Sequence, residues 1–144
     1  MAMMRTTFTL LCTNRFGRQA TFDVSCEEMP SDGFSPANWT FLARPQNASP
    51  TTDFFELLLH ERDGGFARIV MMHNHADPAL RGAGIPDALL PEAARRTGRR
   101  IQSSPTVGDT PDVRRSPEAT KVWQRLVGKG LATFDEQADV FTLL

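Results

Sequence analysis

The sequence contains no tyrosine, two cysteines, and no excess of either charge. Its 16 basic and 17 acidic residues leave a net charge of −1, so nucleic acid is an unlikely partner on composition alone. The longest uncharged apolar run, residues 69–72, is too short to span a bilayer. The first residues also lack the apolar stretch of a signal peptide. These absences predict a cytoplasmic protein with no membrane partner.

The two cysteines, Cys12 and Cys26, do not form a Cys-x-x-Cys motif, which excludes a zinc ribbon or a thioredoxin-like site. If residues 6–26 form a hairpin that turns near Phe16 and Gly17, Cys12 lies opposite residue 20 or 21. Cys26 is then out of disulfide reach. We therefore expect two free thiols, as in a reducing compartment.

The chain has the length of one domain, 144 residues, and an ordinary globular composition, with 40% apolar and 23% charged residues. Apolar and polar residues alternate over 6–13 and again over 19–25, which predicts an N-terminal hairpin. Residues 27–52 are rich in Pro, Ser, Asn and Asp. This composition predicts a long loop with room for one helical turn, in which Trp39 and Phe41 cap the core.

A second hairpin is predicted where residues 53–60 and 66–73 flank Gly64 and Gly65. Both strands are almost continuously apolar, so we expect them to be covered on both faces. A helix is expected over 87–97, with Pro86 at its first position and Pro91 either kinking it or delaying its start.

The strongest helix signal covers residues 116–127. Ser116 is a suitable N-cap, Pro117 suits the first position, and the apolar spacing places Trp123 in a buried stripe. The remaining predicted elements are a strand over 99–104 and a terminal hairpin formed by 131–134 and 139–144.

A glycine-rich turn separates the second hairpin from the first helix, and it consists of Arg81, Gly82, Ala83, Gly84 and Ile85. Small residues before a helix let backbone N–H groups face an anion at the positive end of the helix dipole. The turn is therefore a candidate pyrophosphate site, the alternative being a tight turn without a ligand. On the first interpretation, Gly84→Asp should abolish binding and leave the fold largely intact.

The same residues resemble the acetyl-coenzyme-A signature of the GNAT N-acetyltransferase superfamily, Arg/Gln-x-x-Gly-x-Gly/Ala. Residues 119–126 with 130–132 resemble that family's late helix, and the order of elements over 53–144 is similar too. The resemblance implies one GNAT-like domain over 1–144, of α/β class with a mixed, mostly antiparallel sheet and an atypical part at 1–52. It also implies transfer of an acyl group from acetyl-CoA or another acyl-CoA to an amine of a small molecule or protein. Arg81, Gly82, Ala83, Gly84 and Ile85 would bind the coenzyme.

The chain departs from this family at three places. Pro86, which has no N–H, stands at the signature's final Gly/Ala position. Trp123 stands where the family's tyrosine acts as general acid, and an indole gives up no proton at neutral pH. Residues 14–52 contain no counterpart of the two helices that follow the family's first strand. The alternative is therefore a non-catalytic binding or structural module, for example in a phage particle or an inhibitor complex.

Two histidines on the strand before the turn, His73 and His75, are the candidate general bases. The alternative is that both are polar residues closing a strand. His60 is expected to pair near Ala67 at the far end of the hairpin, so the three histidines cannot converge on a metal ion. His73, His75 and Asp77 together form a weak ligand set, and we expect no metal.

Four arginines, Arg95, Arg96, Arg99 and Arg100, gather where the first predicted helix ends. Cations are favoured there by the helix dipole, which predicts a solvated helix end. The alternative is that they attract the phosphates of coenzyme A or of a nucleic acid. The sequence leaves open whether the protein forms a homo-oligomer.

Overall fold

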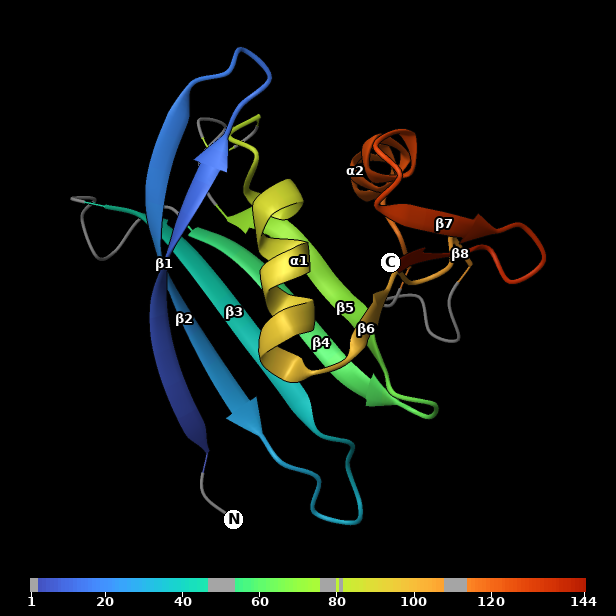
Figure 1. The fold of residues 1–144 in the computed structure, drawn as a ribbon. Coiled ribbons are helices and arrows are strands. Elements are labelled where there is room, and N and C mark those ends of the chain that lie inside the picture. The colour runs from blue at the N-terminus through green and yellow to red at the C-terminus, as the bar shows by residue number, and fades with distance from the viewer. Residues whose placement is uncertain (1–2, 47–53, 76–79, 81, 108–113) are drawn as a thin grey trace.

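The computed structural model describes residues 3–46, 54–75, 80, 82–107 and 114–144. The chain is an α/β protein with one eight-stranded, mostly antiparallel sheet and two helices (Figure 1). In chain order the elements are β1 (Met4–Thr13), β2 (Gln19–Met29), β3 (Asn38–Pro45), β4 (Phe54–Arg62), β5 (Phe66–His75), α1 (Ile85–Thr97), β6 (Arg100–Gln102), α2 (Pro117–Gly128), β7 (Ala132–Asp135) and β8 (Val140–Leu143).

The strands lie side by side in the order β1-β2-β3-β4-β5-β6-β8-β7, and the β5–β6 pair is parallel. The β1–β2 hairpin is confirmed, with Cys12 opposite Ala20. Cys26, opposite Thr6, is also a free thiol. Both predicted later hairpins are present as β4–β5 and β7–β8.

The prediction of a loop over residues 27–52 is wrong for most of its described part. Residues 27–29 continue β2, and Asn38–Pro45 forms β3, which pairs with both β2 and β4. Trp39, Phe41 and Ala43 alternate along β3 with exposures of 4%, 0% and 0%. This period-two burial makes β3 a sheet strand, although polar residues and prolines flank it. Residues 47–52 lie outside the described residues.

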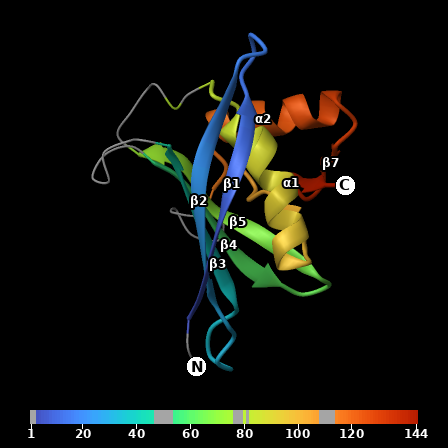
Figure 2. The ribbon, with the colours of Figure 1, turned by 60° about the vertical axis from the view of Figure 1, so that its left-hand side comes forward.

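The two apolar strands β4 and β5 are covered on one face and not on both, contrary to expectation. Phe55, Leu57 and Leu59 are buried beneath the helices, whereas Phe54 and Leu58 on the other face are half-buried. Figure 2 shows α1 lying against one side of the sheet. Within the described part of the chain, no helix covers the outer face, and Phe54 and Leu58 stay half-buried.

A β-bulge interrupts the β4–β5 pairing. Leu58 lies opposite Met71, but the next residue, Leu59, lies opposite Ile69, so Val70 is an extra residue in β5. As a result Ile69 and Met72 pair with residues of the buried face. Met71 and His73 pair with residues of the outer face.

Both predicted helices are confirmed, with small shifts of their ends. Helix α1 begins at Ile85, two residues earlier than expected, and it contains Pro91 within its length. The Ser116 hydroxyl caps α2 by accepting from the Ala119 N–H at 3.1 Å. Trp123 is fully buried and stacks on Phe141, with ring centroids 5.8 Å apart.

Candidate functional site

The pairing between β5 and β6 ends after three residues, Phe66–Arg68 against Arg100–Gln102. Beyond it the chain leaves β5, because the Ser103 N–H donates to the Phe141 carbonyl at 2.9 Å. The Ser104 hydroxyl donates to the Ile69 carbonyl oxygen instead of continuing the ladder. From Ile69 onward, β5 is therefore flanked by β4 on one side and by no strand on the other, among the described residues.

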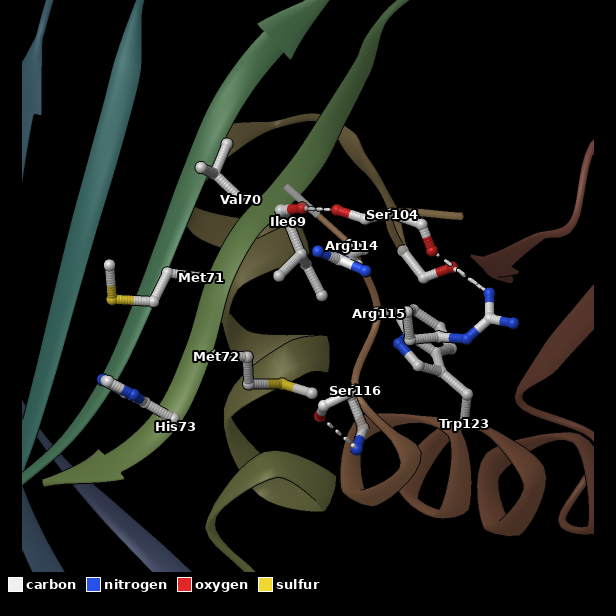
Figure 3. A pocket seen from close by; sticks show the side chains of 12 residues that line it. Ile69, Val70, Met71, Met72, His73, Ser104, Arg114, Arg115, Ser116 and Trp123 are labelled. Atoms are coloured by element: carbon white, nitrogen blue, oxygen red, sulfur yellow. Dashed lines mark hydrogen bonds between the residues drawn. The ribbon is translucent and has the colours of Figure 1, made fainter. Parts of the chain in front are cut away.

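A cavity of about 190 Å³ lies along this edge (Figure 3). Its lining comes from three parts of the chain: the second half of β5, the segment after β6, and the beginning of α2. The lining residues are Ile69, Val70, Met71, Met72, His73, Ser103, Ser104, Arg114, Arg115, Ser116, Ala119 and Trp123. Apolar and polar side chains contribute to this lining in equal number, so the cavity offers both apolar contacts and hydrogen-bonding groups beside a backbone edge.

Residues from both faces of β5 line the cavity, because it lies along the edge of the strand. In Figure 3, Ile69 and Met72 extend toward Arg115 and Trp123, whereas Met71 and His73 extend to the opposite side of the strand. His73 is exposed and lies opposite Glu56 in the register, and His75 lies opposite Phe54. The register thus places the two histidines on one face of β5, as predicted. The side chain of His75 lies outside the described residues.

Arg115 forms one polar side of the cavity, and contacts within the protein fix its guanidinium in place. Its guanidinium donates to the Asp139 carboxylate at 2.7 Å and to the Ser104 carbonyl at 3.1 Å, and it lies over the Phe141 ring. Hydrogen bonds from Thr106 and Arg115 lower the pKa of Asp139 to about 2. Arg115 is 9% exposed, so its role is to fix the segment after β6 against the terminal hairpin.

Trp123 lines the cavity from α2, and its indole nitrogen is buried without a hydrogen-bond partner among the described residues. The sequence predicted its burial correctly. Its apolar periodicity gave no signal that the ring also borders a cavity.

The glycine-rich turn opens α1 as predicted, although Arg81 lies outside the described residues. Gly84 is the N-cap of α1 in the left-handed conformation, with φ of 83°, and no side chain caps the helix. A Cβ atom on Gly84 would lie 2.1 Å from the Thr13 carbonyl oxygen. The expectation that Gly84→Asp leaves the fold intact is therefore wrong, because this glycine lets α1 pack against the end of β1. Gly82, with φ of 75°, is exposed, and a Cβ there would meet nothing within 4 Å.

Basic residues from α2 lie beside the start of α1. Asp87 in the first turn of α1 pairs with Arg125 at 2.8 Å and with Lys129 at 3.4 Å. Ala83 is half-buried in the turn, and Ile85 is fully buried beneath it. The N-terminus of α1 therefore has two cations within reach of its first turn.

The run of four arginines lies at the opposite end of α1. Arg95 and Arg96 pair with Glu92, and Arg99 pairs with Glu61. Because α1 has 13 residues, about 1.5 Å each along the axis, this run is about 20 Å from the turn. These arginines stabilise the helix end and its contacts with the sheet, and they do not surround a ligand held at the turn.

Neither a metal site nor a reactive thiol is found among the described residues. They contain no group of three metal-ligating side chains. His60 lies opposite Arg68, one residue from the predicted neighbour Ala67, and burial lowers its pKa. Burial raises the pKa of both Cys12 and Cys26 to about 11, which keeps these thiols protonated near neutral pH.

No protein-family model, curated protein or solved structure matches this chain. Within the described residues, no helix is long and apolar enough to cross a membrane.

Proposed function

We propose that this protein is a GNAT-type N-acyltransferase, which moves an acyl group from acyl-coenzyme A to an amine. The observation that carries the proposal is the interrupted β5–β6 pairing, which leaves a backbone edge beside a cavity. The glycine-rich turn and α1 follow that strand directly, in the order that the sequence resemblance requires. Strand edge, cavity and helix N-terminus together suit a long ligand with an anionic part and an acyl end.

The anionic part of the ligand suits the turn. The backbone of Gly82, Ala83, Gly84 and Ile85 lies at the positive end of α1, and Arg125 and Lys129, which both pair with Asp87, leave one net positive charge nearby. Gly82 is open to solvent, so a phosphate could approach its backbone closely. Pro86 supplies no N–H, so the turn offers one donor fewer than the family's pattern.

The extended part of the ligand suits the free edge of β5. Unpaired backbone N–H and C=O groups bind amide-containing chains in the way that a sheet edge accepts another strand. The coenzyme's amide-bearing arm would lie along Val70–Met72 and bring its thioester to the cavity. A backbone N–H of the strand would polarise the thioester carbonyl.

The transfer forms a bond between the amine nitrogen and the thioester carbonyl carbon, and the carbon–sulfur bond breaks. The amine approaches from the outer face of β5 and loses a proton to a base, for which we propose His73 or His75 on that face, and the thiolate leaves with the bonding electrons. Trp123 cannot donate a proton, but thiols ionise at a pKa of about 8.5, so the thiolate can leave without an acid. The amine belongs to a small molecule or a protein.

The second candidate is a non-catalytic binding or structural module with the same architecture. Two observations favour it: Pro86 removes a donor from the turn, and Trp123 replaces the acid. Fold alone does not decide between the two candidates.

Binding of acetyl-coenzyme A tests the proposal directly. At 100 times its dissociation constant, a ligand that binds only the folded state adds about 2.7 kcal/mol to stability, which a thermal melt detects. No stabilisation of the wild type would overturn the coenzyme assignment and favour the module.

Two matched variants of Gly82 locate the phosphates. Gly82→Asp and Gly82→Asn impose the same left-handed strain, and both residue types tolerate it. They differ in charge, so the aspartate should weaken coenzyme binding at least tenfold relative to the asparagine. Equal affinities would place the phosphates elsewhere.

Turnover tests the histidines. His73→Gln or His75→Gln should lower turnover by about 10²–10⁴-fold and flatten its rise with pH, with coenzyme affinity unchanged. If turnover survives both substitutions, neither histidine is the base, and the transferase assignment remains in place. An absence of turnover in the wild type, with coenzyme bound, would support the module.

A further inference from the structure

The indole N–H of Trp123 is a buried hydrogen-bond donor without an acceptor among the described residues. Buried Trp N–H groups usually have a partner, and leaving one unsatisfied costs about 1–3 kcal/mol. Here the side chain is fully buried, and the nitrogen has no partner among the described residues. Because the same side chain lines the cavity, a bound ligand can supply the missing acceptor.

Neighbouring polar groups of the cavity are already bonded within the chain. The Ser104 hydroxyl donates to the Ile69 carbonyl, and the Ser116 hydroxyl accepts from the Ala119 N–H. The Arg115 guanidinium bonds to Asp139 and to the Ser104 carbonyl. These groups shape the cavity, whereas the Trp123 N–H retains its full hydrogen-bonding capacity.

Ile69, Met72 and Ala119 add apolar side chains to the lining, and Arg114 lies beside Ile69 (Figure 3). A cavity of about 190 Å³ has room for several non-hydrogen atoms. That is the size of a short acyl group. Figure 3 shows the indole across the cavity from Ile69 and Met72 of β5.

We propose that this cavity holds the acyl chain and that the Trp123 N–H selects acyl chains carrying an oxygen acceptor of their own. The inference rests on the proposed function, in which the β5 backbone already engages the thioester carbonyl. The indole faces the cavity from α2, so it meets an atom further along the chain. An oxo or hydroxyl oxygen there completes the donor, and a purely aliphatic chain leaves it unpaired.

The test compares three probes: coenzyme A, butyryl-coenzyme A and 3-oxobutyryl-coenzyme A. The two thioesters have nearly the same shape and differ by one oxygen. Calorimetry on the wild type should show a fivefold to tenfold preference for the 3-oxobutyryl ligand, the usual effect of one hydrogen bond. Trp123→Phe should bind both thioesters with similar affinities.

The ratio of the two affinities isolates the N–H, because loss of ring size affects both thioesters alike. A wild-type protein that binds both thioesters equally would overturn the inference without any variant. A preference that persists in Trp123→Phe would also overturn it. If coenzyme A and both thioesters all fail to bind the wild type, the proposed function itself fails, which is a distinct result.

Discussion

The β1–β2 hairpin and the β5–β6 pair belong to one sheet but differ in how long they stay paired. β1 pairs with β2 along all 10 of its residues, whereas β6 has 3 residues and pairs with β5 over that length alone. A long ladder satisfies the backbone of its inner edge and leaves no space between strands. The short ladder leaves the edge of β5 beyond Arg68 without a neighbouring strand in the described part of the chain, and the cavity lies along that edge. Within the described residues, the N-terminal hairpin is therefore a continuously paired part of the sheet, and the C-terminal part carries the candidate site.

The largest expected effect is on Trp123, which fills the space between α2 and the sheet. Trp123→Ala should lower the free energy of unfolding by about 3–5 kcal/mol, measured by urea titration. Val127 on the same helix is 38% exposed, so Val127→Ala should cost less than about 0.5 kcal/mol. Similar losses in the two variants would contradict the packing of α2 described above.

Two glycines of the same turn provide the next comparison. Gly82→Ala should cost about 1–2 kcal/mol, because alanine is strained in the left-handed conformation. Gly84→Ala carries the same strain plus the contact with the Thr13 carbonyl, for a total of about 3 kcal/mol. If the two substitutions cost the same in a thermal melt, the close approach of α1 to β1 is incorrect.

Asp139 joins the cavity wall to the terminal hairpin, and its loss should cost about 2 kcal/mol, typical of a hydrogen bond to a charged group. Asn tolerates the positive φ of 56° at this position, so Asp139→Asn isolates the charge. The folded pKa of about 2 lies below the ordinary value, so this stabilisation is complete above the unfolded pKa and is lost as pH falls from about 4 to 2. Acid titration of stability should show a shallower fall in that window for the asparagine variant. Parallel curves would argue against the ion pair with Arg115.

The smallest expected effect concerns Cys26 in the N-terminal hairpin. Cys26→Ala removes one buried atom and should cost about 1 kcal/mol, with coenzyme affinity unchanged. With pKa values of about 11, both native thiols should react with a thiol reagent at pH 8 far more slowly than in the urea-unfolded chain. Rapid native labelling would mean that the β1–β3 region opens readily.

Local sequence signals were sufficient where a single segment determines its own structure. The caps and apolar spacing of residues 116–127 predicted α2, and apolar segments around short turns predicted the three hairpins. The strand β3 was not predicted because its flanks are rich in turn-forming residues. Its alternating Trp39, Phe41 and Ala43 carried a signal that composition obscured.

The site depends on contacts between distant segments, which the sequence does not display. Gly84 matches a phosphate-binding signature, yet a Cβ at this position would collide with the backbone of Thr13, which lies far away in the sequence. The cavity exists because β6 stops after Gln102 and the next residues turn toward β8. Residue types alone gave the candidate histidines and the turn, but neither the cavity nor the unpaired indole nitrogen.

The extra residue Val70 shifts the alternation of side chains by one position between the two halves of β5. Side chains alternate faces along a strand, so Ile69 and Met72, three residues apart, would ordinarily point in opposite directions. The bulge places both toward α2 and sends His73 to the other side of the sheet. Deleting Val70 would remove the bulge and leave these side chains on their present faces, whereas pairing Val70 in a regular ladder would bring His73 toward the helices and Met72 to the outer face. One inserted residue thus decides which side chains of β5 face α2 and which lie on the outer face of the sheet.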